Sequence, residues 1–210
     1  MKYIFVAGAP GSKWSSVAKN IYYSPSIDRS DHRDDWTYCD TANQQTEPMH
    51  VGAYWDPGMA CPLPEYLSVM TKKDAEQSFD YPFAQPRGNK FRIIKSHIFC
   101  FKENLEYLRS NWPESPIVLV HRSNDSCLGW WVRSGGFDIG YPDYRPYYQN
   151  FREMARIIEL QNAGVLHAWW ANPGHYVENN QQLAQVLGLE PVPPQYQQEY
   201  VVSDVRVKVI

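Results

Sequence analysis

The sequence predicts an α/β fold: one domain with a mainly parallel central sheet and helices on its faces. Two observations predict it. Short apolar runs alternate along the chain with stretches of helical periodicity, which is the element order of a parallel sheet. The first apolar run, residues 3–7, passes into the glycine-rich turn GAPGSK at Gly8–Lys13 and then into a helical stretch. Such a turn favours a P-loop-like phosphate cradle, because backbone N–H groups at a helix start converge on an anion.

Composition describes a soluble globular chain. A chain of 210 residues can bury its own core, and we expect residues 1–210 to form a single domain with an irregular insertion at about 24–90. The net charge of −3 argues against a general nucleic-acid binder, which normally carries a basic excess. No apolar run reaches the length of a membrane span, and the apolar start is too short for a signal peptide.

The cysteines are widely spaced and form no Cys-x-x-Cys pair; they are Cys39, Cys61, Cys100 and Cys127. This spacing argues against both a disulfide framework and a zinc finger. We therefore expect reduced thiols, a cytoplasmic protein and no bound metal.

Apolar runs with the composition of buried strands each lead into polar or helical sequence. They cover residues 2–7, 91–95, 116–121 and 164–169. The tail at 201–210 alternates valine with polar residues, which predicts a late strand at the sheet edge.

Helical periodicity follows most of these runs. The predicted helices cover residues 13–23, 101–111, 124–133, 147–162 and 177–187. The last of them runs into Leu187-Gly188-Leu189, with glycine at a position where helices commonly stop. Residues 24–90 are irregular and rich in Pro, Asp, Gln and aromatic residues, but 64–78 predicts a helix within them.

A second motif, Lys95-Ser96-His97, ends the apolar run at 91–95. If this run is a parallel strand beside the first one, His97 lies at the carboxyl edge of the sheet, next to the Gly8–Lys13 turn. An imidazole and a lysine ammonium would then lie over a phosphate site. This combination indicates group transfer.

A trio of motifs, in this order, resembles the sulfotransferases that use 3′-phosphoadenosine 5′-phosphosulfate (PAPS). Gly8–Ser16 is similar to that family's 5′-phosphosulfate loop and is one residue short of the kinase pattern GxxxxGK. Arg92–Ile98, RIIKSHI, is similar to its segment R-x-I-K-T-H-x. Ile117–Asp125, IVLVHRSND, is similar to its turn V-x-V-x-R-N-P-K-D, and Val177–Leu189 resembles its late helix. The chain thus resembles a divergent member of the family over most of its length, residues 24–90 and the C-terminus excepted.

The resemblance implies a role for each matching residue. His97 would be the base that takes the acceptor proton, while Lys13 and Lys95 would stabilise the departing phosphate. Arg122, with Ser123 or Ser126, would contact the 3′-phosphate. The residues that would bind the 5′-phosphosulfate end of the cofactor are Gly11, Ser12, Lys13, Trp14, Ser15 and Ser16, with Trp14 also a candidate to stack on the adenine. The cofactor would be PAPS, its product 3′,5′-diphosphoadenosine, and the reaction would require no metal.

The sequence departs from the family at defined positions. Lys13 stands where glycine is usual, and Trp130 stands where a serine is usual. The family's basic, glycine-rich C-terminal segment is missing, which leaves Arg206 and Lys208 as the candidates to close over the nucleotide.

Two alternatives to a sulfotransferase stay open. One is a P-loop nucleotide kinase, which would need Mg²⁺ and an acidic residue at a strand end, whereas these strands end in Lys95-Ser96-His97 and His121-Arg122. The other is a nucleotide-binding relative without catalysis. The acceptor would be a small molecule, glycan or lipid with a hydroxyl or amine, in a pocket formed by residues 24–90 and the aromatic stretch 130–148.

Overall fold

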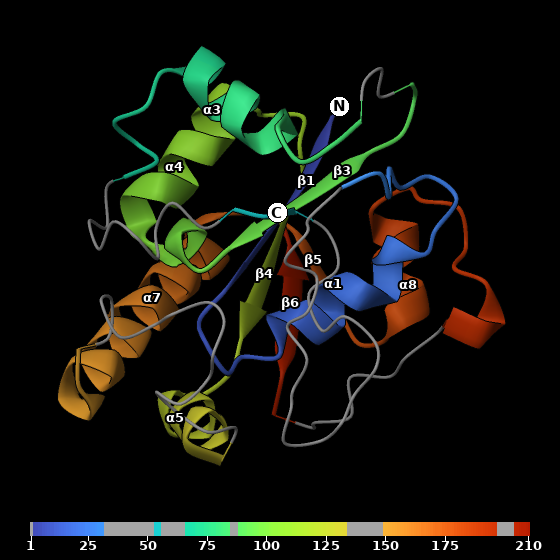
Figure 1. Cartoon of the computed structure of the whole chain (residues 1–210). Helices are drawn as coiled ribbons and strands as arrows, with labels where there is room; N and C mark the ends of the chain where they lie inside the picture. Colours follow the sequence, from blue (N-terminus) through green and yellow to red (C-terminus); the bar gives the residue numbers. More distant parts are fainter. Residues whose placement is uncertain (1, 32–52, 56–65, 85–87, 134–148, 197–203) are drawn as a thin grey trace.

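The chain folds around one mixed β-sheet (Figure 1). The computed structural model describes residues 2–31, 53–55, 66–84, 88–133, 149–196 and 204–210. The sheet order is β2-β3-β1-β4-β6-β5. Its strands are β1 (Tyr3–Gly8), β2 (Ala53–Tyr54), β3 (Arg92–Ser96), β4 (Ile117–His121), β5 (His175–Val177) and β6 (Arg206–Val209). The predicted α/β class is therefore confirmed.

Pairing directions explain why the sheet is mixed. β1 pairs in parallel with β3 on one side and with β4 on the other, and β2 pairs in parallel with β3. β6 runs antiparallel to both β4 and β5. Because Ala7 lies opposite Ser96 and Gly8 lies opposite Val120, the carboxyl ends of β1, β3 and β4 meet at one edge of the sheet.

Helices cover both faces of the sheet. They are α1 (Trp14–Tyr22), α3 (Lys72–Asp80), α4 (Lys102–Asn111), α5 (Asn124–Arg133), α7 (Phe151–Ala171) and α8 (Asn180–Val186), with short 3₁₀ turns η1 (Ile98–Cys100) and η3 (Pro194–Tyr196). α1 packs on α8, while α7 packs on α4 and α5. Figure 1 shows α1 and α8 on one side of the strands and α3, α4 and α7 on the other. The chain thus leaves β1 and β3 toward opposite faces of the sheet.

Among the described residues, no helix has both the length and the apolar character needed to cross a bilayer.

The predicted strand at 164–169 is wrong, because these residues lie inside α7. Burial along α7 follows a helical repeat, with Gln161, Val165 and Ala168 buried on one face. A side chain at Gly164 would lie 2.0 Å from the carbonyl oxygen of Cys100, so a glycine lets α7 pack tightly against η1. The apolar run was therefore the buried face of a long helix, which apolarity alone does not distinguish from a strand.

Other boundaries shift by a few residues. α7 begins at Phe151 because the Asn150 side chain caps it by accepting from the Glu153 N–H at 3.0 Å. The predicted helix 177–187 begins only at Asn180, since Val177 belongs to β5, and Gly188 at its end has a φ of 65°. The predicted helix within 64–78 is α3, which begins after the cap residue Thr71.

The predicted tail strand exists, but it is not an edge strand: β6 lies between β4 and β5. Residues 201–203 lie outside the described residues. Val207 and Val209 are buried, and the buried Lys208 ammonium donates to the Trp169 and Asn172 carbonyls at 2.6 and 2.8 Å. Lys208 therefore holds the end of α7, so the expectation that it closes over a nucleotide is wrong in this structure.

An ion-pair network ties the described parts of residues 24–90 to the sheet. The Arg92 side chain is fully buried; its Nε lies 3.0 Å from Asp28 and its Nη1 2.7 Å from Asp80. Tyr3 also donates to Asp80, at 3.0 Å. A guanidinium can be buried in a folded protein only when it has such partners, because an unpaired buried charge costs several kcal/mol of stability. Arg92 thus has a structural role in anchoring this segment.

Candidate functional site

The turn after β1 is a compact loop with two residues in the left-handed region. The Ser12 N–H donates to the Ala9 carbonyl at 3.0 Å, and φ is 81° at Gly11 and 68° at Lys13. A left-handed conformation costs a lysine about 1–3 kcal/mol, and such strain concentrates at ligand-binding sites. Gly11 is required sterically as well, because a Cβ there would lie 2.3 Å from the Cys127 carbonyl oxygen.

The loop leads directly into the first turn of α1. Lys13 occupies the N-cap position, and no side-chain hydrogen bond caps the helix there. Ser15 and Ser16 lie in this turn and are partly exposed. The Ser12 hydroxyl is buried and has no hydrogen-bond partner among the described residues. The N-terminal end of α1 is therefore suited to an anion, since it carries partial positive charge.

His97 lies beside this loop, as its position after β3 predicted. Its Nδ1 lies 2.7 Å from the Gly8 carbonyl oxygen, which can only accept a hydrogen bond. Nδ1 therefore carries the proton, and Nε2 keeps its lone pair. The side chain is 4% exposed. Burial lowers the pKa of His97 from 6.5 to about 4, the Gly8 hydrogen bond opposes this shift, and nearby Lys95 adds to it. The imidazole is neutral at pH 7 and can accept a proton.

Trp14 packs against both His97 and Lys95. Its ring centroid is 4.5 Å from that of His97, at an interplanar angle of 68°. The Lys95 ammonium lies 5.3 Å from the Trp14 ring centroid, and the Lys95 side chain is fully buried in β3. Trp14 itself is 3% exposed, so the ring face that would stack on an adenine is covered in this structure. Trp14 instead fixes the orientation of His97 and Lys95.

Lys13 leans away from β3 toward α5. Its ammonium lies 4.9 Å from the ring centroid of Trp130 in α5. Partial burial lowers the pKa of Lys13, and the positive charges of Arg122 and Arg133 lower it further. A cationic cluster thus forms between the loop and α5, and it includes Arg133, which sequence reasoning missed.

Arg122, at the end of β4, holds the opposite end of the loop from His97. Its Nη1 donates to the Gly11 carbonyl at 3.0 Å, and its Nε donates to both carboxylate oxygens of Asp204, each at 3.0 Å. Asn162 of α7 donates to the Arg122 carbonyl at 2.9 Å, which fixes the backbone there. The loop is therefore braced from both sides, by a histidine on the β3 side and an arginine on the β4 side.

The two candidate serines differ in their surroundings. Ser123 is exposed, and its hydroxyl accepts from the Ser126 N–H at 3.2 Å at the start of α5. The pKa of Asp204 is lowered, first by interaction with the Ser126 side chain and then by the ion pair with Arg122. The sequence did not predict Asp204 as a site residue, because it lies 82 residues from Arg122 and no local pattern links the two.

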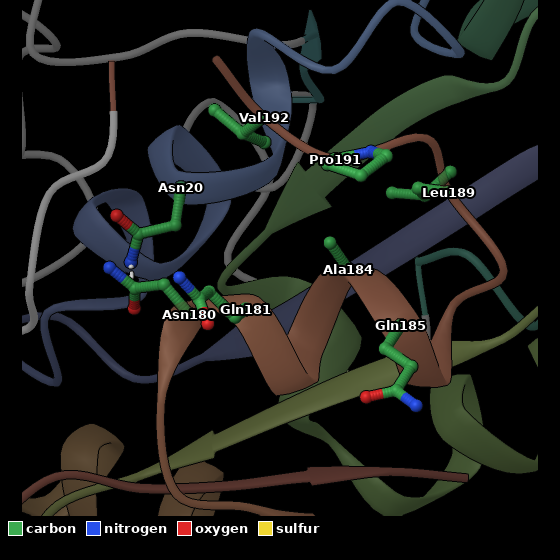
Figure 2. Close-up of a pocket in the computed structure, with 8 residues that line it drawn as sticks. All are labelled: Asn20, Asn180, Gln181, Ala184, Gln185, Leu189, Pro191 and Val192. Carbon is green, nitrogen blue, oxygen red and sulfur yellow. Dashed lines mark hydrogen bonds between the residues drawn. The ribbon is translucent and has the colours of Figure 1, made fainter. Parts of the chain in front are cut away.

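A cavity of about 420 Å³ lies elsewhere, between α1, α8 and the segment 189–192 (Figure 2). Asn20, in the last turn of α1, donates to the Asn180 side chain at 2.8 Å on its wall. None of the predicted site residues lines this cavity. Within the described ranges, histidine, cysteine, aspartate and glutamate side chains nowhere gather into a group that could hold a metal ion.

The site thus unites most of the predicted residues around one loop: His97, Lys95 and Trp14 at its Gly8 end, and Arg122, Ser126 and Lys13 at its Gly11 end. No family model, curated protein or solved structure matches this chain. The fold and site define an α/β protein with a buried histidine held on the loop that follows its first strand.

Proposed function

We propose that the chain is a transferase of the PAPS-dependent sulfotransferase type. The observation that carries the proposal is the hydrogen bond from His97 Nδ1 to the Gly8 carbonyl. It joins a neutral base to the same short loop whose helix end suits a phosphate. Base and phosphate site then keep a fixed separation, which is what an in-line transfer requires.

The reaction proceeds with the nucleotide's 5′-phosphosulfate on the loop and the acceptor beside His97. The acceptor hydroxyl or amine attacks sulfur, and its proton passes to His97 Nε2. The new bond joins sulfur to the acceptor, while the bond between sulfur and the bridging phosphate oxygen breaks. Lys13, Lys95 and the N–H groups at the start of α1 stabilise the negative charge on the departing 3′,5′-diphosphoadenosine.

Lys95 supports this role through its burial. An ammonium in the interior, close to the loop, interacts with a developing charge more strongly than the same group in water. The buried Ser12 hydroxyl adds support, since a buried polar group with no partner among the described residues costs about 1–3 kcal/mol until a polar ligand pairs with it.

The competing nucleotide-kinase assignment is less well supported by the residues at the strand ends. A kinase of the P-loop class holds Mg²⁺ with a loop hydroxyl and a strand-end carboxylate. β3 leads into His97 and β4 into Arg122, and the Asp204 carboxylate is paired with Arg122. These charges favour an anion without a companion metal.

The test separates the base from the loop brace. In His97→Asn, an amide N–H can replace Nδ1–H as donor to Gly8, but no Nε2 remains. We expect calorimetry to show that 3′,5′-diphosphoadenosine binds the variant within about threefold of wild type, while the rate of sulfuryl transfer from PAPS to a panel of phenols, alcohols and amines falls at least ~10²-fold. His175→Asn, at an exposed histidine of β5, is the matched control and should keep full activity.

Full activity of His97→Asn would remove His97 from the mechanism. Binding of 3′,5′-diphosphoadenosine without transfer to any acceptor would favour a non-catalytic nucleotide-binding protein. Stabilisation by ATP with Mg²⁺, but not by 3′,5′-diphosphoadenosine, would favour the kinase.

A further inference from the structure

The residues expected to hold a 3′-phosphate already hold an anion that belongs to the protein. Both oxygens of the Asp204 carboxylate accept from Arg122 Nε at 3.0 Å. The Ser126 side chain also interacts favourably with this carboxylate, because it lowers the pKa of Asp204. Carboxylate and phosphate oxygens compete for the same donors, because both bind a guanidinium and hydroxyls through charge-assisted hydrogen bonds.

Asp204 reaches this position from the start of β6. Arg206, the first residue of β6, lies opposite His121, the last residue of β4, so Asp204 lies at the sheet edge that carries the loop. The charges of Arg122 and Arg133 lower the pKa of Lys13 and that of Asp204 raises it, so these charges lie near enough to act on one another. Arg122 pairs with the Asp204 carboxylate, and Lys13 and Arg133 add two further positive charges nearby, so the group retains a positive excess that suits a ligand of higher charge than Asp204.

The two side chains of the Arg122–Asp204 ion pair differ in exposure and in their other contacts. The Arg122 side chain is 6% exposed and is also held by Gly11, whereas the Asp204 side chain is 39% exposed. Asp204 is therefore the partner that can leave, while Arg122 stays in position on the loop.

We propose that Asp204 is a built-in competitor that occupies the Arg122–Ser126 anion subsite and is displaced by the 3′-phosphate of the nucleotide. The inference rests on the proposed function. A tethered carboxylate has a high effective concentration at Arg122, so a weakly charged ligand does not displace it. A phosphate monoester carries close to two negative charges at pH 7 and does. Asp204 then discriminates in favour of nucleotides that carry a second phosphate.

The test compares 3′,5′-diphosphoadenosine with adenosine 5′-monophosphate by calorimetry. Asp204→Asn keeps the side-chain shape and removes the competing charge, so we expect it to bind the diphosphate roughly tenfold more tightly than wild type. The affinity for the monophosphate should change less than about twofold. Asp125→Asn removes an equal charge from an exposed residue in the first turn of α5 and is the matched control; it should change neither affinity by more than about twofold. An unchanged or weaker affinity of Asp204→Asn for the diphosphate would overturn the inference, because Asp204 would then only support Arg122.

A nucleotide-free arm separates this inference from the proposed function. Inorganic sulfate is titrated into wild type and Asp204→Asn, and binding is followed by the NMR signal of Arg122 Nε–H. If neither protein binds either nucleotide, the proposed function fails. Tighter binding of sulfate by Asp204→Asn than by wild type would still support the inference that Asp204 competes with anions for Arg122. Equal binding of sulfate by the two proteins would overturn that inference. If Asp204→Asn does not fold, the carboxyl ¹³C signal of Asp204 in wild type decides, since sulfate must move it if the carboxylate is displaced.

Discussion

His97 makes the stability of the fold depend on pH in a defined window. The pKa of His97 is lowered to about 4 in the native protein, mainly by burial, against about 6.5 in the unfolded chain. Between these two values the unfolded state binds a proton that the native state does not bind. The free energy of unfolding therefore falls as pH falls from 6.5 to 4, and the contribution of His97 is complete above pH 6.5.

The size of the effect follows from the pKa difference. A depression from 6.5 to about 4 corresponds to about 3 kcal/mol lost from the free energy of unfolding across this window. Other groups also change protonation in acid, including His121, whose pKa is lowered by burial and by the charge of Arg206. The measurement must therefore be a difference between wild type and a variant that lacks only the His97 imidazole.

Urea denaturation of wild type and His97→Asn, followed by tryptophan fluorescence at several pH values from 7.5 to 4, provides that difference. We expect the stability advantage of wild type over His97→Asn to shrink by about 3 kcal/mol between pH 7.5 and 4. An NMR titration of the His97 imidazole gives a second reading of the same pKa. A difference that stays constant over this range would refute the argument that burial lowers the pKa of His97.

Two further predictions concern the loop. In Gly11→Ala, the new Cβ lies 2.3 Å from the Cys127 carbonyl oxygen and φ is 81°, so we expect urea or thermal unfolding to show a loss of stability of at least ~2 kcal/mol. Gly188→Ala is the control, because φ is 65° there and nothing lies within 4 Å of the new Cβ, so it measures the backbone penalty alone. Equal losses in the two variants would mean that the loop shifts to relieve the contact with α5. Arg122→Ala removes the brace on Gly11, so calorimetry should show weaker binding of adenosine 5′-monophosphate and a further loss of roughly 1.5–3 kcal/mol for 3′,5′-diphosphoadenosine. Equal weakening of both nucleotides would limit Arg122 to holding the loop.

Local sequence determined the elements next to the site. A buried apolar run, a glycine-rich turn and a helical stretch specify β1, the loop and α1, because each depends on neighbouring residues. Parallel pairing of β1 with β3 then places His97 beside the loop, which is why a motif 89 residues from Gly8 could be assigned to the same site. The stop of α8 at Gly188 is equally local, since it follows from a left-handed turn.

The tertiary structure decided what each polar side chain contacts. The apolar residues at 164–169 fit either a strand or the buried face of a helix. They form a helix, and Gly164 in it packs closely against η1. The partner of Arg122 is Asp204, and that of Lys208 is the end of α7, because β6 inserts between β4 and β5 instead of lying at the edge. Sequence patterns report periodicity within about one element, whereas hydrogen bonds and ion pairs between distant segments depend on strand order. That order is set by the packing of the whole sheet.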